Sequence, residues 1–177
     1  METYKHLEDS RIDEEFRSTA YKALQELKSM GYTFVPYCGI RTPLEQAKEW
    51  RKGRSTWTIN RRVNKLRKQG CDYLADCIVQ VGPQHGKKST GAIPGLSWHQ
   101  YGGAMDCYYL KNNKIDWNDI SAYKIYRKIC KKHGLHRAFV SDWVHVQVSK
   151  LSGPHKVFSM KQINDLMIQK FGAAIEV

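Results

Sequence analysis

The apolar positions of the chain recur at helical spacing in several stretches, some of which end at a glycine. Between about residues 13 and 30 this spacing predicts a helix that ends at Gly31. A second helix is expected to begin after Thr42, because threonine can cap free amides, Pro43 suits the first helical position and Glu45 can close a capping box. Further helices are predicted around Ile59–Leu66, Asp72–Val79, Ile120–His133 and residues 159–171.

Shorter stretches with β-branched and aromatic residues predict strands. Thr33–Cys38 is expected to be an edge strand, because Pro36 cannot donate a backbone hydrogen bond. Residues 104–110 and 144–148 are the other predicted strands. Together these elements predict an α+β fold in which a small, mainly antiparallel sheet is flanked by helices.

Alternation along the strands decides which side chains share a face of the sheet. Asp106 is expected on the face opposite to that of its neighbour Cys107. In the last strand the valines should face the core, so that His145 and Gln147 face the other side. A loop rich in glycine, proline, serine and threonine, from about residue 81 to 96, precedes the second strand.

The length and composition suit one globular domain with a hydrophobic core. The chain has 177 residues, of which 41% are hydrophobic and 26% charged. We expect a single domain over residues 1–177, with a catalytic core over about 8–150 and a C-terminal helix over about 159–171. No apolar run is long enough to predict a transmembrane segment, and residues 1–8 lack an apolar signal core. Synthesis in the cytoplasm without a signal peptide is therefore expected.

The net charge of +12 is concentrated in two stretches, Arg51–Lys68 and Lys124–Arg137, neither of which contains an acidic residue. Such stretches attract polyanions such as nucleic acid, anionic lipid or a cell-wall polymer, although a single basic residue is more often part of a solvated helix face. The five cysteines are odd in number and form no Cys-x-x-Cys pair. We therefore expect reduced thiols rather than a disulfide framework or a structural zinc site.

Residue types that bind zinc occur in two short stretches. His99, Asp106 and His145 fit a catalytic zinc site, in which three protein ligands leave an open position for water. Gly102 and Gly103 allow a turn between the first two. Without a turn, an extended segment of this length would hold them roughly 23 Å apart.

A second carboxylate lies near the predicted ligands in sequence. Asp142 precedes His145 by three positions and is a candidate base that takes a proton from water. Spacing alone is a weak signal, because isolated histidines are more often hydrogen-bonded structural groups than metal ligands.

The neighbours of these residues carry a resemblance to the LAS-type zinc peptidases. That family includes D-alanyl-D-alanine carboxypeptidases and dipeptidases, and the L-alanyl-D-glutamate peptidases found among phage endolysins. The chain resembles it in the string Ser-x-His-x-x-Gly-x-Ala-x-Asp at Ser97–Asp106 and in Asp-x-x-His at Asp142–His145. Gly39–Thr42, Gln46 and Gly53–Ser55 look like the family's arginine-bearing turn and its following helix.

The resemblance implies a DD-peptidase or hedgehog-like zinc peptidase fold. It implies one zinc ion at His99, Asp106 and His145, with Asp142 as the catalytic base. Many relatives carry glutamate where this chain has Asp142, and aspartate there looks more like the L-alanyl-D-glutamate branch. The segment between about residues 55 and 90 is longer than in compact endolysin domains, so the resemblance does not extend to it.

The resemblance also implies that Arg41 holds the substrate carbonyl or the developing oxyanion, as a fixed cation can. The alternative for Arg41 is a salt bridge that fixes its turn, for example to Glu45. Supporting roles in substrate binding or ligand orientation are expected for Ser97, Gln147, Gln46 and Trp143. For the tryptophan, ordinary packing explains its presence equally well.

We therefore expect a monomeric zinc metallopeptidase that cuts the stem peptide of bacterial peptidoglycan at the L-alanyl-D-glutamate bond, like a phage or prophage endolysin. Its basic surface would attract anionic wall polymers, and no specific nucleic acid partner is expected. A D-alanyl-D-alanine carboxypeptidase is the alternative within the same chemistry. A basic nucleic-acid-binding module with a structural or vestigial metal site, and a metal-binding virion protein, are alternatives from other classes. Asp142 distinguishes the peptidase from these last two alternatives, because a purely structural metal site needs no second carboxylate beside it.

Overall fold

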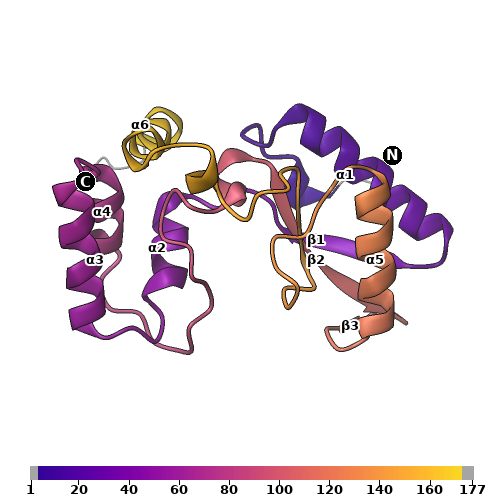
Figure 1. Cartoon of the computed structure of the whole chain (residues 1–177). Helices are drawn as coiled ribbons and strands as arrows, with labels where there is room; N and C mark the ends of the chain where they lie inside the picture. Colours follow the sequence, from indigo (N-terminus) through magenta and orange to yellow (C-terminus); the bar gives the residue numbers. More distant parts are fainter. Residues whose placement is uncertain (1–3, 173–177) are drawn as a thin grey trace. The chain divides into compact units, whose positions relative to one another are not determined.

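The strand β2 (Ala104–Lys111) lies at the centre of the sheet in a computed structural model that describes residues 4–172. The strand β1 (Thr33–Cys38) pairs with it along one edge (Figure 1). The short strands β3 (Lys114–Asp116) and β4 (His145–Gln147) pair with its two ends along the other edge. Every pair is antiparallel, which confirms the predicted α+β fold with a small antiparallel sheet.

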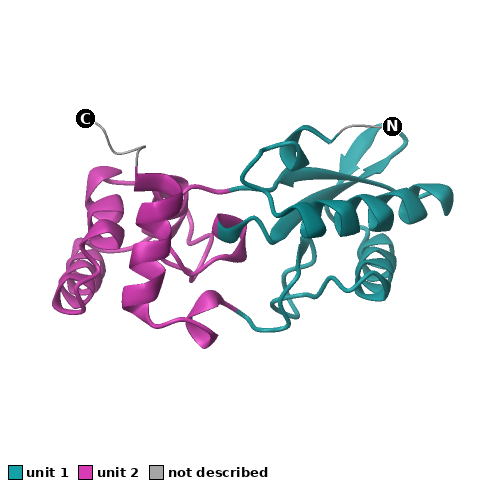
Figure 2. Cartoon of the chain, turned by 90° about the horizontal axis from the view of Figure 1, so that it is seen from above, with its two compact units in different colours: residues 1–40, 101–152 teal, residues 41–100, 153–177 magenta. Residues whose placement is uncertain are grey.

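The chain divides into two compact units, which Figure 2 shows in different colours. Unit 1 comprises Met1–Ile40 and Tyr101–Ser152, and it contains the sheet. Unit 2 comprises Arg41–Gln100 and Gly153–Val177, and it is helical.

The core of unit 1 forms between one face of the sheet and the helices α1 (Glu14–Ser29) and α5 (Ile120–Lys132). Alternate residues of β2, namely Met105, Cys107 and Tyr109, are buried in this core. Aromatic rings fill much of it, and Phe34 of β1 stacks on Tyr126 of α5 with ring centroids 4.6 Å apart. Burial of these side chains is the main force that holds the sheet to its helices.

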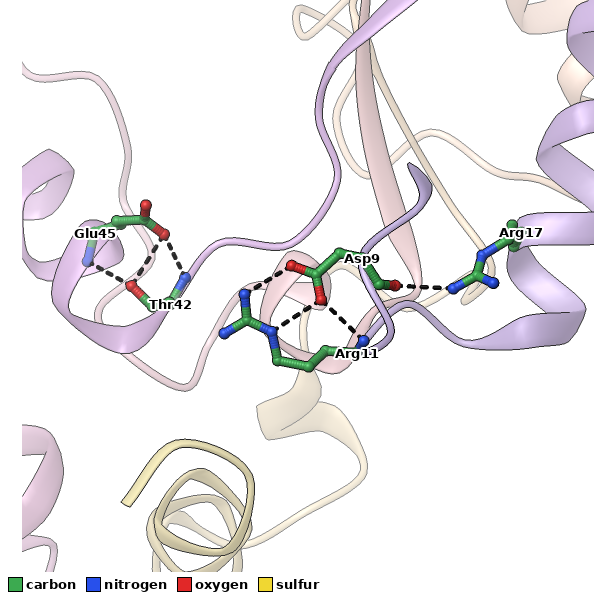
Figure 3. Close-up of polar contacts among 5 residues, drawn as sticks. All are labelled: Asp9, Arg11, Arg17, Thr42 and Glu45. Carbon is green, nitrogen blue, oxygen red and sulfur yellow. Dashed lines mark hydrogen bonds and ion pairs between the residues drawn. The ribbon is translucent and has the colours of Figure 1, made fainter. Parts of the chain in front are cut away.

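The segment that leads into α1 is held by local polar contacts (Figure 3). Asp9 forms an ion pair with Arg11 at 2.7 Å, and its carbonyl accepts a hydrogen bond from Arg17 at 2.8 Å. The Asp13 side chain caps α1 by accepting from the Phe16 amide. These contacts place the segment beside residue 102, whose carbonyl accepts a hydrogen bond from the Asp13 amide at 3.2 Å.

Unit 2 is built around the helix α4 (Asp72–Gln80), which packs against three other helices. These are α2 (Pro43–Arg51), α3 (Thr56–Lys68) and α6 (Met160–Phe171). The predicted capping box of α2 is present: Thr42 accepts from the Glu45 amide, and the Glu45 carboxylate accepts from Thr42 (Figure 3). The loop predicted over residues 81–96 is confirmed, and residues 81–97 contain no helix or strand.

Most predicted elements are confirmed within one or two residues of their ends, although α3 begins at Thr56, three residues before the predicted start, and three short 3-10 helices among the described residues were not predicted. The sheet differs further. The strand predicted over 144–148 covers only His145–Gln147, and Val148 is 48% exposed rather than in the core. The strand β3 was not predicted, because its three residues are too few for a pattern. All five cysteines are free thiols, as expected.

No helix in residues 4–172 is both long and apolar enough to cross a membrane. The stretch whose lack of a signal core was noted from the sequence begins with residues 1–3, which lie outside the described residues.

We predict that Gly102→Ala destabilises the protein more than Gly134→Ala. Both glycines have positive φ, so either alanine costs about 1 kcal/mol in backbone strain. A Cβ at Gly102 would also lie 2.4 Å from the Arg11 carbonyl oxygen and 2.8 Å from the Asp13 nitrogen, whereas nothing lies within 4 Å at Gly134. Displacing that backbone should cost about 1–3 kcal/mol more. Denaturant unfolding measures both values, and equal losses would contradict the prediction.

Candidate metal centre

The face of the sheet that points away from the helices of unit 1 carries a row of polar side chains. In the antiparallel register Asp106 of β2 lies directly opposite His145 of β4 and Cys38 of β1. The carboxylate and the imidazole are both buried, 7% and 8% exposed. The predicted faces are therefore confirmed: Asp106 and His145 share one face, and Cys107 lies in the core behind it.

Both nitrogens of the His145 imidazole face oxygen acceptors. Nδ1 lies 2.9 Å from Asp106 Oδ1, and Nε2 lies 3.0 Å from Gln147 Oε1. The orientation of the Gln147 amide is fixed, because its Nε2 donates to the carbonyls of Ser149 and Leu151 at 2.6 and 2.7 Å. Gln147 can therefore only accept from the histidine.

This arrangement fits a cation at Asp106 and His145. A neutral imidazole has one N–H, and donation to Gln147 places that hydrogen on Nε2. Nδ1 then presents a lone pair on the same side as the Asp106 carboxylate. Two electron-pair donors that face each other need a proton or a metal ion between them. One imidazole nitrogen and one carboxylate oxygen are ligands that zinc accepts.

Cys38 is a neighbour of this pair that the sequence reasoning missed. Its sulfur and a carboxylate oxygen of Asp106 lie within 4.8 Å of each other, and the residue is half-buried. A thiolate is also a zinc ligand. The sequence places this cysteine at the end of a strand but says nothing of the pairing register, so it was grouped with the other reduced thiols.

Asp142 lies on an irregular segment that Arg127 of α5 holds in place. The guanidinium donates to the carbonyl oxygens of Val140 at 3.0 Å and Phe139 at 3.3 Å, and also to that of Asp142 itself. Its centre lies 4.1 Å from the ring centroid of Trp143. Burial lowers the pKa of Arg127, although a guanidinium remains charged at any physiological pH. The backbone at Asp142 and just before it is thus tied to a half-buried cation.

The arginine predicted to take part in catalysis belongs to unit 2. Arg41 donates to Gln46 Oε1 at 3.2 Å, and the buried Gln46 donates from Nε2 to the Ala92 carbonyl at 2.7 Å. Gln46 thereby links the turn before α2 to the loop of residues 81–97. Glu45, the partner considered for Arg41 from the sequence, is engaged in the capping box instead.

His99 lies on the short 3-10 helix η2 (Trp98–Tyr101), and its side chain is 2% exposed. The half-buried Ser97 accepts a backbone hydrogen bond from Gln100 at 3.0 Å, which closes the turn of this helix. The predicted site residues therefore fall into two groups. Asp106, Asp142, Trp143, His145 and Gln147 belong to unit 1, and Arg41, Gln46, Ser97 and His99 belong to unit 2.

Comparison with known proteins gives no match to any protein-family model and none to any curated protein. Among solved structures the chain is similar to a mutant of the vancomycin resistance D,D-pentapeptidase VanY from a VanB-type resistance cassette, in complex with Zn(II). The TM-score is 0.48 and the identity 15%, over 87% of this chain and 78% of that one. It is also similar to VanYB in complex with D-Alanine-D-Alanine, with a TM-score of 0.47 and 14% identity over 93% and 84% of the two chains.

We predict that Arg127→Lys loosens residues 138–143. A lysine keeps the charge, but its compact ammonium cannot match the spacing of these carbonyls as the planar guanidinium does, nor stack flat on Trp143. Amide hydrogen exchange in this segment should become about tenfold faster, as expected for the loss of roughly 1–2 kcal/mol of local stability. Lys128→Gln, one residue along α5, is the control and should leave the exchange unchanged. Equal protection in both variants would show that Arg127 does not hold the segment.

Proposed function

We propose that the protein is a zinc-dependent peptidase that hydrolyses the stem peptide of bacterial peptidoglycan. The observation that carries the proposal is the buried pair of Asp106 and His145, in which Gln147 holds the imidazole so that Nδ1 faces the carboxylate. The LAS-type motif names the same aspartate and histidine as metal ligands. Geometry and motif therefore support one site.

The proposed ligands of one zinc ion are His99, Asp106 and His145. The geometry of unit 1 supports the last two, whereas His99 is included because of the motif and its burial. When bound, zinc supplies Lewis acidity, which polarises a peptide carbonyl and brings the pKa of water towards neutrality. Gln147 is proposed to orient His145, a role that partners of metal-bound histidines commonly have.

Asp142 is the proposed general base. Its carboxylate would accept a proton from the attacking water and return it to the amine that leaves when the peptide bond breaks. The anchoring of its backbone by Arg127 supports this role, because a catalytic carboxylate must be held in one position. Arg41 is proposed, on the motif alone, to donate to the substrate oxygen as negative charge develops there.

The bond proposed to be cut is that between L-alanine and D-glutamate. The support is the aspartate at position 142, which resembles the L-alanyl-D-glutamate branch of the family. This assignment suits a phage or prophage endolysin that is made in the cytoplasm and then acts on the wall as a monomer. Release of terminal D-alanine is the competing reaction, which the same site chemistry would perform on a different bond.

We predict that His145→Ala binds zinc at least about 100-fold more weakly, because one of three protein ligands is lost. Cys38→Ala should keep one zinc ion per chain, since the proposed ligand set does not include this thiol. Metal analysis after dialysis against a weak chelator measures both, with circular dichroism to confirm folding. Full zinc content in His145→Ala would remove the histidine from the ligand set, and loss of zinc in Cys38→Ala would add the cysteine to it.

We predict that the zinc-loaded protein cleaves a soluble stem peptide between L-alanine and D-glutamate, with products identified by mass. Asp142→Asn should retain zinc but lose about 10²–10⁴-fold in kcat/KM, because an amide cannot accept the proton. Removal of the metal by a chelator should abolish cleavage. Release of terminal D-alanine alone would identify a carboxypeptidase, and an active Asp142→Asn variant would exclude Asp142 as the base.

A further inference from the structure

A pocket of about 650 Å³ opens on unit 1 beside α5. Most of the side chains that line it are lysines and arginines, and none is acidic. Lys124, Lys128 and Lys131 lie on one face of the helix, at the spacing that brings side chains of successive turns together. Arg137 and Lys150 complete the rim from the segments that follow α5.

Most of the positive charge around this pocket is not paired with a carboxylate, although that of Asp142 raises the pKa of Arg127. None of its lysines, nor Arg137, forms an ion pair with a carboxylate among residues 4–172. Burial lowers the pKa of His136, and Lys150 and Lys131 lower it further. Burial likewise lowers the pKa of Arg127, with Arg137 as the next cause. The groups in the pocket thus feel one another's charge, and an anion that enters would relieve this repulsion.

The lining favours an extended polyanion over a single small anion. The three lysines of α5 span two turns, or roughly 10 Å along the helix. Lysine presents a mobile point charge, which suits successive phosphates along a polymer rather than the fixed, bidentate recognition of one group.

The aromatic residue in the pocket argues against nucleic acid as that polymer. Proteins that bind single-stranded nucleic acid without sequence preference usually combine a basic groove with exposed aromatic faces on which bases stack. Trp143 is the aromatic residue of this lining, and the Arg127 guanidinium covers its ring at 4.1 Å. A phosphodiester polymer without bases needs no exposed aromatic ring for stacking.

We propose that this pocket binds a polyol-phosphate polymer of the bacterial cell wall. The choice of a wall polymer rests on the proposed function, whereas the anion site itself rests on the pocket and its charges. Arg127 and Trp143, which line the pocket, also hold the segment that carries Asp142. Polymer bound here therefore lies against the segment of the proposed catalytic base.

The test uses the full chain and a defined poly(glycerol phosphate) in a direct binding titration at fixed salt. The variant Lys128→Gln/Lys131→Gln removes charge from the pocket. The control Lys22→Gln/Lys114→Gln removes the same charge from exposed positions outside it, and each variant has a net charge of 12 − 2 = +10. We expect Kd to rise about tenfold or more for the pocket variant and less than about twofold for the control, with a smaller salt dependence only in the former.

Equal weakening by both variants would overturn the proposal in favour of diffuse attraction to the whole basic surface. A single-stranded DNA of matched charge that binds more tightly than the polymer would overturn it in favour of nucleic acid. The proposed hydrolysis is scored separately with the soluble stem peptide, which carries no polymer. If the unmodified protein hydrolyses the peptide but does not bind the polymer, the polymer site is refuted and the proposed function stands. If it binds the polymer but does not hydrolyse the peptide, the proposed function is refuted and the polymer site stands.

Discussion

The register of β2 against its two neighbours is the constraint on which the candidate site of unit 1 depends. Met105 and Cys107 are buried on one face of this strand, and their packing holds the strand in place. Asp106 between them must then point to the other face, opposite Cys38 and His145. A slip by one residue would turn the carboxylate into the core, where an unpaired charge is costly. Packing of the apolar face of the sheet thus determines which side chains lie together on its polar face.

His145 and the segment of Asp142 are each held in place by a residue that does not itself react in the proposed mechanism. Two backbone carbonyls fix the orientation of the Gln147 amide, so its oxygen holds the imidazole hydrogen of His145 on Nε2. Arg127 fixes the segment of Asp142 in a similar way, through backbone oxygens rather than through the carboxylate. Several hydrogen bonds to fixed partners restrict a polar group to one arrangement, and a single arrangement is what a metal site or a catalytic base requires.

Each of the two basic stretches of the sequence divides in the fold between charges with structural partners and charges that line a pocket. In the first, Arg67 pairs with Asp76 at 2.8 Å, and Arg54 donates to the carbonyls of Trp50 and Thr90. Part of that charge therefore stabilises unit 2. In the second, the lysines of α5 line a pocket without an acidic residue. Lys132 of the second stretch pairs with Glu26 at 2.7 Å, and Arg61, Lys65 and Lys68 of the first line another pocket. Charge in either stretch is therefore partly structural and partly available for binding.

Much of the secondary structure of this protein could be predicted from its sequence alone, because it depends on local physical chemistry. The cap at Thr42, most helix bounds and the two faces of β2 follow from periods of two and 3.6 residues and from contacts within a few positions. Tertiary structure decided what depends on distant pairs: that Cys38 lies beside Asp106, that Asp106 faces His145, and that Arg127 anchors the segment of Asp142. Such contacts join residues far apart in the chain, and no periodicity encodes which of them meet. They form only when packing of the apolar face brings the strands and α5 together.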